Sequence, residues 1–320
     1  MREVAPIASR PWVTKTKPHR CHRVPLWPVD CTTFLKRAKI EVNPPPESGL
    51  ACSSGLRCGL IGDTMNTESR KRTFSDLISI VIPTYNEREN IDLLVKSIQD
   101  LALALQIIVV DDNSPDGTGE LANDLAGQHP GIHVIHRPGK LGLGTAHIAG
   151  MRAALARGAA YIITMDADFS HHPRYLPALI EALDHSDVVI GSRYVPGGGT
   201  LCCTAPRKAL SRGANLFTRA VLNLCASDAT AGFRGYRRAV LESIPLDHIM
   251  SDGYSFLIEM LYVCQRHGWQ IGEVPIVFEN RRRGASKISK TEILKAVQTV
   301  VRLGWKRFSG GTTSSRTITP

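Results

Sequence analysis

From residue 78 onward, the sequence alternates short apolar runs with amphipathic segments, which restricts the chain to few folds. The runs at 78–82 and 107–110 have the length of buried strands. Between them, apolar residues recur every three or four positions, as on one helix face: Ile91, Leu94, Val95, Ile98 and Leu101. Similar patterns predict strands at 133–135, 161–165 and 188–190, and helices near 117–127, 145–157 and 174–184. Strands alternating with helices predict an α/β fold around a mostly parallel sheet.

Three of the predicted strands end in polar residues. These ends are residues 83–87 (Pro-Thr-Tyr-Asn-Glu), 111–117 (Asp-Asp-Asn-Ser-Pro-Asp-Gly) and 166–168 (Asp-Ala-Asp). Each one alone could be a turn or a helix cap, because Asn, Asp, Pro and Gly are common at both. Ligands of open α/β sheets bind at the carboxyl ends of the strands. Three polar ends at one edge therefore favour a binding site.

The triplet Asp166-Ala167-Asp168 is the most informative of these ends. Two alternate carboxylates can bind one hard cation, Mg²⁺ or Mn²⁺, that also holds a diphosphate. Such a cation would stabilise the negative charge on a departing nucleoside diphosphate. The adjacent His171 and His172 do not indicate zinc, because neighbouring side chains cannot easily converge on one ion.

Longer motifs follow one another in a defined order. They comprise 82–90 (Ile-Pro-Thr-Tyr-Asn-Glu-Arg-Glu-Asn), 140–144 (Lys-Leu-Gly-Leu-Gly), 165–173 (Met-Asp-Ala-Asp-Phe-Ser-His-His-Pro), 191–194 (Gly-Ser-Arg-Tyr), 207–214, 228–234, 251–256 and 272–287. In these motifs, residues 76–308 resemble the family 2 glycosyltransferases of GT-A fold. Their order and spacing are most similar to those of dolichol- or polyprenol-phosphate mannose synthases. The resemblance implies a nucleotide-diphospho-sugar transferase fold and a metal-dependent, inverting transferase.

The resemblance also implies which residues bind the donor. Those around the nucleoside are Pro83, Tyr85, Glu87, Val110 and Asp112. Those around the metal and the diphosphate are Asp166, Ala167 and Asp168, with both carboxylates as metal ligands. Basic groups for the phosphate oxygens are Arg193, Arg281 and Lys287. Some members have Gln as a further metal ligand where this chain has Ser170, which leaves that ligand in doubt, with water as the alternative.

The implied reaction transfers mannose from GDP-mannose to dolichyl or polyprenyl phosphate. Alternatives are glucose or an N-acetylhexosamine from a UDP-sugar and, more distantly, a non-catalytic nucleotide-binding protein. The acceptor phosphate is already an anionic nucleophile at neutral pH, so in-line displacement needs little or no general base. The expected catalytic residues are Asp168, Arg193 and Arg207. Arg207 and Arg212 are both candidates for the acceptor phosphate, with Arg207 favoured by the family pattern and a solvated helix face as the alternative.

The segment 281–308 has nine Lys or Arg residues and one acid, Glu292, interleaved with apolar residues. This pattern predicts a basic amphipathic helix that lies on an anionic membrane. A core-packed helix with a basic solvent face is the alternative. The pattern neither requires nor excludes a membrane-anchoring subunit as a partner. The net charge of +10 fits anionic partners in general, but no nucleic-acid motif appears, so nucleic acid is not expected.

The two ends of the chain differ from the domain between them. Residues 1–72 contain eight of the nineteen prolines and no regular period, so we expect disorder or, with Met65 as the true start, an over-extended reading frame. Residues 309–320 are expected to be a disordered tail. With no apolar run long enough to span a bilayer and no signal peptide, we expect a cytoplasmic protein. It would be peripheral on the cytosolic face of a membrane: the plasma membrane in a bacterium, the endoplasmic reticulum in a eukaryote.

Deleting residues 1–64 is expected to leave the specific transferase activity unchanged. The reason is that every candidate site residue lies at or beyond Pro83. Limited proteolysis of the full chain should cut first before residue 75. A chain that begins at Met65 but fails to fold, or folds without activity, would contradict this expectation.

Overall fold

The structure is a computed structural model, and it describes residues 76–201, 203–279 and 290–309. The expectations for residues 1–72 and 310–320 lie outside these ranges, as do the roles given to Arg281 and Lys287. Among the described residues, no helix combines the length and the apolarity needed to cross a bilayer.

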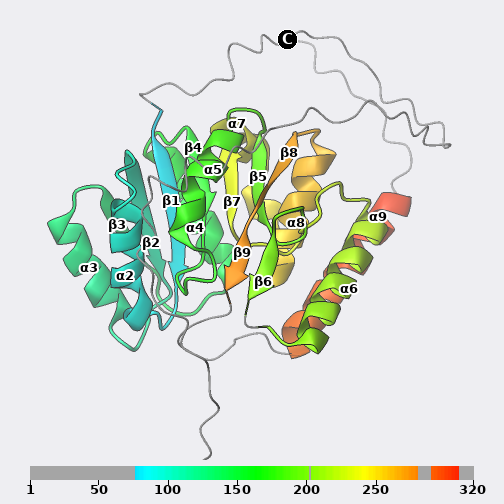
Figure 1. Ribbon diagram of the computed structural model, residues 1–320, viewed down its shortest axis with the longest axis horizontal. Coiled ribbons are helices and arrows are strands. Elements are labelled where there is room, and N and C mark those ends of the chain that lie inside the picture. Colours follow the sequence, from blue (N-terminus) through cyan, green and yellow to red (C-terminus); the bar gives the residue numbers. More distant parts are fainter. Residues whose placement is uncertain (1–75, 202, 280–289, 310–320) are drawn as a thin grey trace, which may run out of the picture. The chain divides into compact units, whose positions relative to one another are not determined.

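A seven-stranded sheet with the order β3-β2-β1-β4-β7-β5-β8 organises the described residues (Figure 1). Its strands are β1 (Ile78–Thr84), β2 (Leu105–Asp111), β3 (Ile132–His136), β4 (Tyr161–Thr164), β5 (Val188–Ser192), β7 (Arg234–Arg237) and β8 (Ile271–Pro275). Strand β7 is antiparallel to both of its neighbours, and all other adjacent pairs are parallel. The prediction of a mostly parallel α/β sheet, including its five strands, is confirmed.

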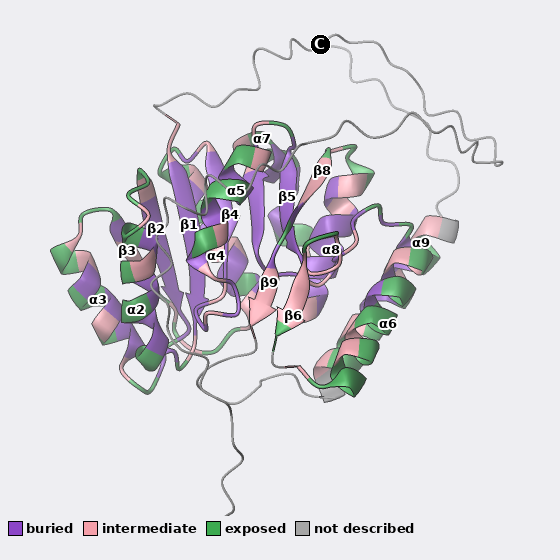
Figure 2. Cartoon of the chain, in the orientation of Figure 1, coloured by how far each residue is buried: buried purple, intermediate pink, exposed green. Residues whose placement is uncertain are grey.

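Helices cover both faces of this sheet (Figure 2). One face packs against α2 (Arg88–Gln99), α3 (Thr118–Gln128) and α5 (Leu176–Ala182), the last preceded by the short η2 (Pro173–Tyr175). The other face packs against α4 (Leu143–Ala156), α7 (Arg238–Ser243) and α8 (Tyr254–Arg266), with η3 (Leu246–His248) after α7. Ile78, Ile80 and Ile82 belong to one core and Val81 to the other, which explains why this strand is apolar on both faces, with Ser79 as the exception.

Two helices and a small second sheet complete the fold near the carboxyl end of β5. Strand β6 (Gly199–Leu201) pairs in parallel with β9 (Val277–Glu279). Helix α6 (Ala205–Leu222) lies beside α9 (Lys290–Ser309), and α9 also packs against α8 (Figure 1). Gly304 allows this close approach, because a Cβ atom there would lie 2.7 Å from Val221 Cγ1. The C-terminal helix is therefore present, and one of its sides is packed against the domain.

His147 of α4 is a buried polar residue at the contact with α8. Its ring stacks on Phe256 with 5.6 Å between the centroids, and neither ring nitrogen has a hydrogen-bond partner within the described ranges. Burial, with smaller contributions from Arg234 and His171, lowers the pKa of His147 to about 3. The imidazole is therefore neutral in the folded protein at neutral pH.

His147 is expected to make the fold sensitive to acid. Its pKa is lower in the folded chain than the ordinary value of 6.5, so the unfolded chain binds the proton more tightly. The free energy of unfolding should therefore fall as the pH drops below about 6.5. Between pH 7 and pH 5, the parent should lose about 2 kcal/mol more than His147→Leu. Urea unfolding of both proteins at the two pH values measures this difference, and equal losses would show that His147 is not responsible.

Candidate active site

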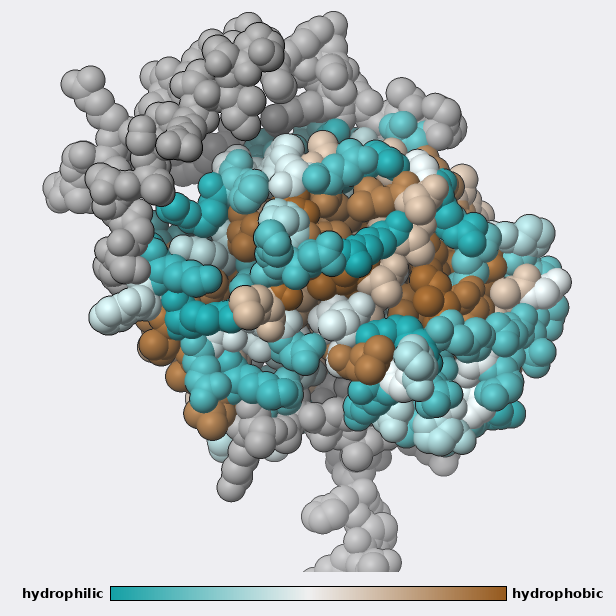
Figure 3. Space-filling model, turned by 180° about the vertical axis from the view of Figure 1, so that it is seen from behind, coloured by the Kyte–Doolittle hydropathy of each residue, from teal (hydrophilic) through white to brown (hydrophobic). Residues whose placement is uncertain are grey.

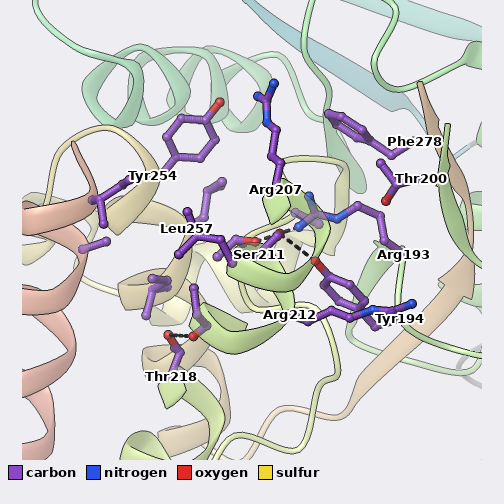
Figure 4. A pocket seen from close by; sticks show the side chains of 18 of the residues that line it. Arg193, Tyr194, Thr200, Arg207, Ser211, Arg212, Thr218, Tyr254, Leu257 and Phe278 are labelled. Carbon is purple, nitrogen blue, oxygen red and sulfur yellow. Dashed lines mark hydrogen bonds between the residues drawn. The ribbon is translucent and has the colours of Figure 1, made fainter. Parts of the chain in front are cut away.

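A cavity of about 760 Å³ lies beyond the carboxyl ends of β4 and β5, and helices α6, α8 and α9 line its other sides (Figure 4). One part of its wall is polar and includes Asp166, Asp168, Arg193 and Arg207. Another part is apolar, and its residues come from the three helices: Leu210, Phe217, Leu257, Ile293, Val297 and Val300. The cavity can therefore hold a ligand with a charged group at one end and a hydrocarbon chain at the other.

The two aspartates after β4 differ in exposure. Asp168 is buried, and its Oδ1 accepts a hydrogen bond from the Ser170 backbone N–H at 3.0 Å. The Asp166 side chain is 27% exposed, and its backbone N–H donates to Nδ1 of His171 at 3.3 Å. Since Nδ1 accepts this bond, we assign the imidazole proton to Nε2. The His171 ring stacks on Phe233 with 5.3 Å between the centroids, and this packing fixes the ring that accepts the Asp166 N–H.

The two carboxylates suit a hard divalent cation, but they do not complete a metal shell. In the part of the chain that the structure describes, no cluster of three or more His, Cys, Asp or Glu residues could hold a metal ion. Oxygen atoms of a substrate or of water would have to supply the remaining ligands, as is usual for Mg²⁺. Ser170, at the position of the missing Gln, is buried.

Arg193, directly after β5, is held by an almost fully buried carboxylate. Its Nε and Nη2 each donate to Asp228 at 2.7 Å, and Nη2 also donates to Thr230 Oγ1 at 2.7 Å. Burial opposes both charges, but their mutual hydrogen bonds outweigh it, raising the pKa of Arg193 and lowering that of Asp228. Nη1 makes no hydrogen bond with any residue in the described ranges. The guanidinium is thus held through its Nε and Nη2 groups, and its Nη1 group can donate hydrogen bonds to a ligand.

Helix α6 carries the two arginines predicted for the acceptor, and both line the cavity. Figure 4 shows Arg207 pointing to the same side as the hydroxyl of Tyr254, whereas Arg212 extends beside Tyr194. Between them, the Tyr194 hydroxyl and Ser211 Oγ are 2.7 Å apart. The two arginines therefore lie on different sides of this pair, and Arg207 is the one that shares its side with Tyr254. Ser211 and Tyr254 lie in the motifs 207–214 and 251–256, but no role was predicted for either side chain.

The residues predicted for the nucleoside lie at the ends of β1 and β2, outside this cavity. Pro83 and Val110 are buried, and the Val110 side chain belongs to the core, so only its backbone could face a nucleotide. Glu87 accepts a hydrogen bond from Asn90 Nδ2 at 2.9 Å. Tyr85 is half-buried, and Lys140 Nζ lies 4.2 Å from the centre of its ring.

The hydrogen-bond partners of Asp112 were not predicted from the sequence. Its Oδ1 accepts a hydrogen bond from Arg137 Nη1 at 2.6 Å, and its Oδ2 accepts one from the Leu141 backbone N–H at 3.2 Å. Burial raises the pKa of Asp112, and the charge of Arg137 offsets part of that rise. Arg137 also donates to Thr145 Oγ1 at 2.6 Å. Asp112 therefore anchors the loop between β3 and α4 beside the nucleoside residues.

Solved structures with the same arrangement of elements include glucosyl-3-phosphoglycerate synthase from Mycobacterium tuberculosis in complex with Mn²⁺, UDP and glucosyl-3-phosphoglycerate. The TM-score is 0.54 at 22% identity, covering 78% of this chain and 84% of that one. A second similar structure is described as a mycobacterial protein, with a TM-score of 0.55 at 23% identity, covering 75% of this chain and 77% of the other. At such identities the likeness shows the fold alone, and that fold is GT-A.

Two relatives are much more similar in sequence. An undecaprenyl-phosphate mannosyltransferase from Micrococcus luteus is 46% identical over 224 residues, which are 70% of this chain and 92% of the relative. A polyprenol monophosphomannose synthase from Mycolicibacterium smegmatis is 45% identical over 227 residues, covering 70% of this chain and 86% of the relative. The model of the family described as Glycosyl transferase family 2 matches residues 79–244. With more than half of its length matched, and with the strand ends and cavity arranged as above, this chain belongs to glycosyl transferase family 2.

Proposed function

We propose that this protein transfers mannose from GDP-mannose to a polyprenyl phosphate, with inversion at the anomeric carbon. The observation that carries the proposal is the two-part cavity, in which Asp166, Asp168 and Arg193 share one space with an apolar wall from α6, α8 and α9. A sugar acceptor would need polar contacts along its whole length, whereas a lipid phosphate needs cations at one end and hydrocarbon contacts at the other. The relatives named for polyprenyl-phosphate mannose synthesis support the same reaction.

In the proposed reaction, an oxygen of the acceptor phosphate attacks the anomeric carbon of mannose. The bond from that carbon to the donor diphosphate breaks, and GDP leaves with the electron pair. Arg207 binds the acceptor phosphate, and the N–H donors of Arg193 bind phosphate oxygens from a fixed position. No proton has to be removed from the nucleophile, so the chain needs to orient charges rather than supply a base.

The proposed metal is Mg²⁺ or Mn²⁺, held by Asp166 and Asp168. When bound, it would act as a Lewis acid that stabilises the charge on the leaving diphosphate. The Mn²⁺ in the similar glucosyl-3-phosphoglycerate synthase supports a divalent cation but does not choose between the two. Ser170 N–H, bonded to Asp168, holds one of the two carboxylates in place for this role.

The identity of the donor nucleotide and of its sugar can be tested with labelled donors. Purified protein is incubated with polyprenyl phosphate and, separately, with labelled GDP-mannose, UDP-glucose or UDP-N-acetylglucosamine. Label that becomes lipid-extractable only from GDP-mannose is the expected result. Extraction of label from a UDP-sugar instead would replace the proposed donor by the alternative.

We also propose that α6 and α9 place the cavity against the cytosolic face of an anionic membrane. Large apolar side chains on both helices are exposed, among them Leu216, Leu294, Val301 and Trp305. On the left edge of Figure 3, where this end of the domain lies after the half-turn, apolar side chains reach the surface between hydrophilic ones. Burying such side chains in the interface, together with lysines nearby, gives the affinity of an amphipathic helix for lipid.

Not all basic residues of α9 face outward. Arg302 Nη2 donates to Ser251 Oγ at 2.9 Å and approaches Glu259 at 3.2 Å, while Arg307 Nη1 donates to the Val221 carbonyl at 3.0 Å. These two arginines attach α9 to α8 and α6. Lys295 and Lys306 are exposed and are the described cations of α9 that can meet lipid headgroups.

Replacing Asp168 with Ala is expected to lower turnover at least about a thousandfold, because one ligand of the cation that holds the leaving group is lost. The affinity for Mn²⁺ in the presence of GDP, measured by calorimetry, should fall in parallel, with little change in the melting temperature. The surface variant Asp247→Ala serves as the control, since Asp247 is exposed and its carboxylate pairs with an exposed arginine. Turnover that survives this replacement, or treatment with EDTA, would exclude the metal assignment.

Replacing Leu294, Val301 and Trp305 of α9 together with Ser is expected to lower binding to anionic liposomes about tenfold or more, because apolar area is lost from the interface. Turnover with a long polyprenyl phosphate should fall, whereas a short, water-soluble acceptor phosphate should react as before. The control replaces the exposed Leu93 and Leu103, which lie on and after α2, with Ser. Equal sedimentation of the triple variant and the control would refute the membrane proposal.

A further inference from the structure

The loop between α6 and β7 contains Asp228 and Thr230, the two residues that hold Arg193, and side chains of other elements fix this loop. Glu273 of β8 accepts hydrogen bonds from the backbone N–H groups of Ser227 at 2.7 Å and Asp228 at 3.1 Å. The position of the Arg193 guanidinium therefore depends on the backbone of this loop.

Asn215 connects the same loop to the helix that faces the acceptor. It lies in the middle of α6 and is only 3% exposed. Its Oδ1 accepts the Ala229 backbone N–H at 2.9 Å, and its Nδ2 donates to the Ser211 carbonyl at 3.0 Å and to Thr230 Oγ1 at 3.3 Å. The Asn215 amide thus links the turn of α6 that begins at Ser211 to Thr230, which accepts a hydrogen bond from Arg193.

The hydroxyl of Thr230 is hydrogen-bonded to both Arg193 and Asn215. Its Oγ1 accepts hydrogen bonds from Arg193 Nη2 at 2.7 Å and from Asn215 Nδ2, and it donates to Asp228 Oδ1 at 3.3 Å. A hydroxyl has one donor and two acceptor positions, and here all three are used. Such a fully satisfied, partly buried hydroxyl favours one geometry of the groups around it.

We propose that Asn215 is a positioning residue that sets the distance between Arg193, after β5, and the acceptor-facing side of α6, where Arg207 lies. This inference rests on the proposed function, since it assigns the two arginines to two substrates that must meet in line. Asn215 itself does not line the cavity. It acts through Thr230 and Ala229 on one side and through the backbone of α6 on the other.

The expected consequence is a loss of rate that is much larger than any loss of donor binding. Displacing a substrate-positioning group by about 1 Å can cost on the order of a hundredfold in rate. The metal carboxylates follow β4 and the nucleoside residues follow β1 and β2, and neither set is hydrogen-bonded to Asn215. Because Arg193 is only one of the groups proposed to bind the donor, the affinity for GDP with Mn²⁺ should fall far less than the rate when Asn215 is changed.

The test compares the parent with Asn215→Leu, which keeps the approximate volume and removes all three hydrogen bonds. With polyprenyl phosphate, kcat should fall about 30-fold to 100-fold. The dissociation constant of GDP in the presence of Mn²⁺, from calorimetry, should rise far less than kcat falls. The matched control is Gln106→Met, which removes a buried amide bonded to Ser79 between β2 and β1, in the half of the sheet away from β5, and should keep the parental kcat.

A second pair of variants separates positioning from folding. Thr230→Val keeps the shape and removes the shared hydroxyl, whereas Thr230→Ser keeps the hydroxyl. The inference predicts that Thr230→Val reproduces the fall in kcat and that Thr230→Ser restores most of it. Parental kcat in Asn215→Leu, or GDP affinity falling as far as kcat, would overturn the inference. A parent that transfers no mannose would instead refute the proposed function, and the inference with it.

Discussion

Arg234 is fully buried, and the geometry of the site depends on how its charge is satisfied. The guanidinium donates to the carbonyls of Ala229, Ala231 and Leu257 at 2.6–2.8 Å. Because an unpaired buried charge is very costly, these bonds require the loop before β7 to keep one conformation against α8. Strand β7 is antiparallel between β4 and β5, and Arg234 pairs with Thr164 and Ile190, shortly before the aspartates proposed for the metal and Arg193. Arg234 does not line the cavity, yet it fixes the loop beside which the proposed catalytic groups stand.

The site has two halves that are built in different ways. The half proposed for the nucleoside, at β1 and β2, is held by hydrogen bonds between the ends of adjacent parallel strands, such as Thr84 Oγ1 to Asp111 Oδ1 at 3.0 Å. The half proposed for the acceptor depends on side chains that join helices to a loop or to one another outside the sheet, such as Asn215 with Ala229 and Arg302 with Glu259.

This difference explains what could be predicted from the sequence. The strands with apolar runs, the helices with apolar faces and the aspartates at 166 and 168 follow from local patterns, and their placement at one sheet edge follows from parallel pairing. Strand β7, with the sequence Arg-Gly-Tyr-Arg, has no apolar run and is recognisable only through its partners. The same holds for Arg137 as the partner of Asp112, because a salt bridge between residues 25 positions apart leaves no period in the sequence.

The phosphate groups of the proposed substrates need positive charge, and the paired arginines of the two halves supply little of it. Arg193 is already neutralised by Asp228, so it contributes directed N–H donors but little net positive charge to a diphosphate. Arg137 is likewise paired with Asp112. Asp166 and Asp168 add negative charge to the same cavity that must receive a diphosphate and an acceptor phosphate. Arg207, Lys208 and Arg212 also line the cavity, but they stand on α6 and not beside the two aspartates after β4 in the chain. A divalent cation between the carboxylates and the diphosphate is the simplest source of positive charge at that place.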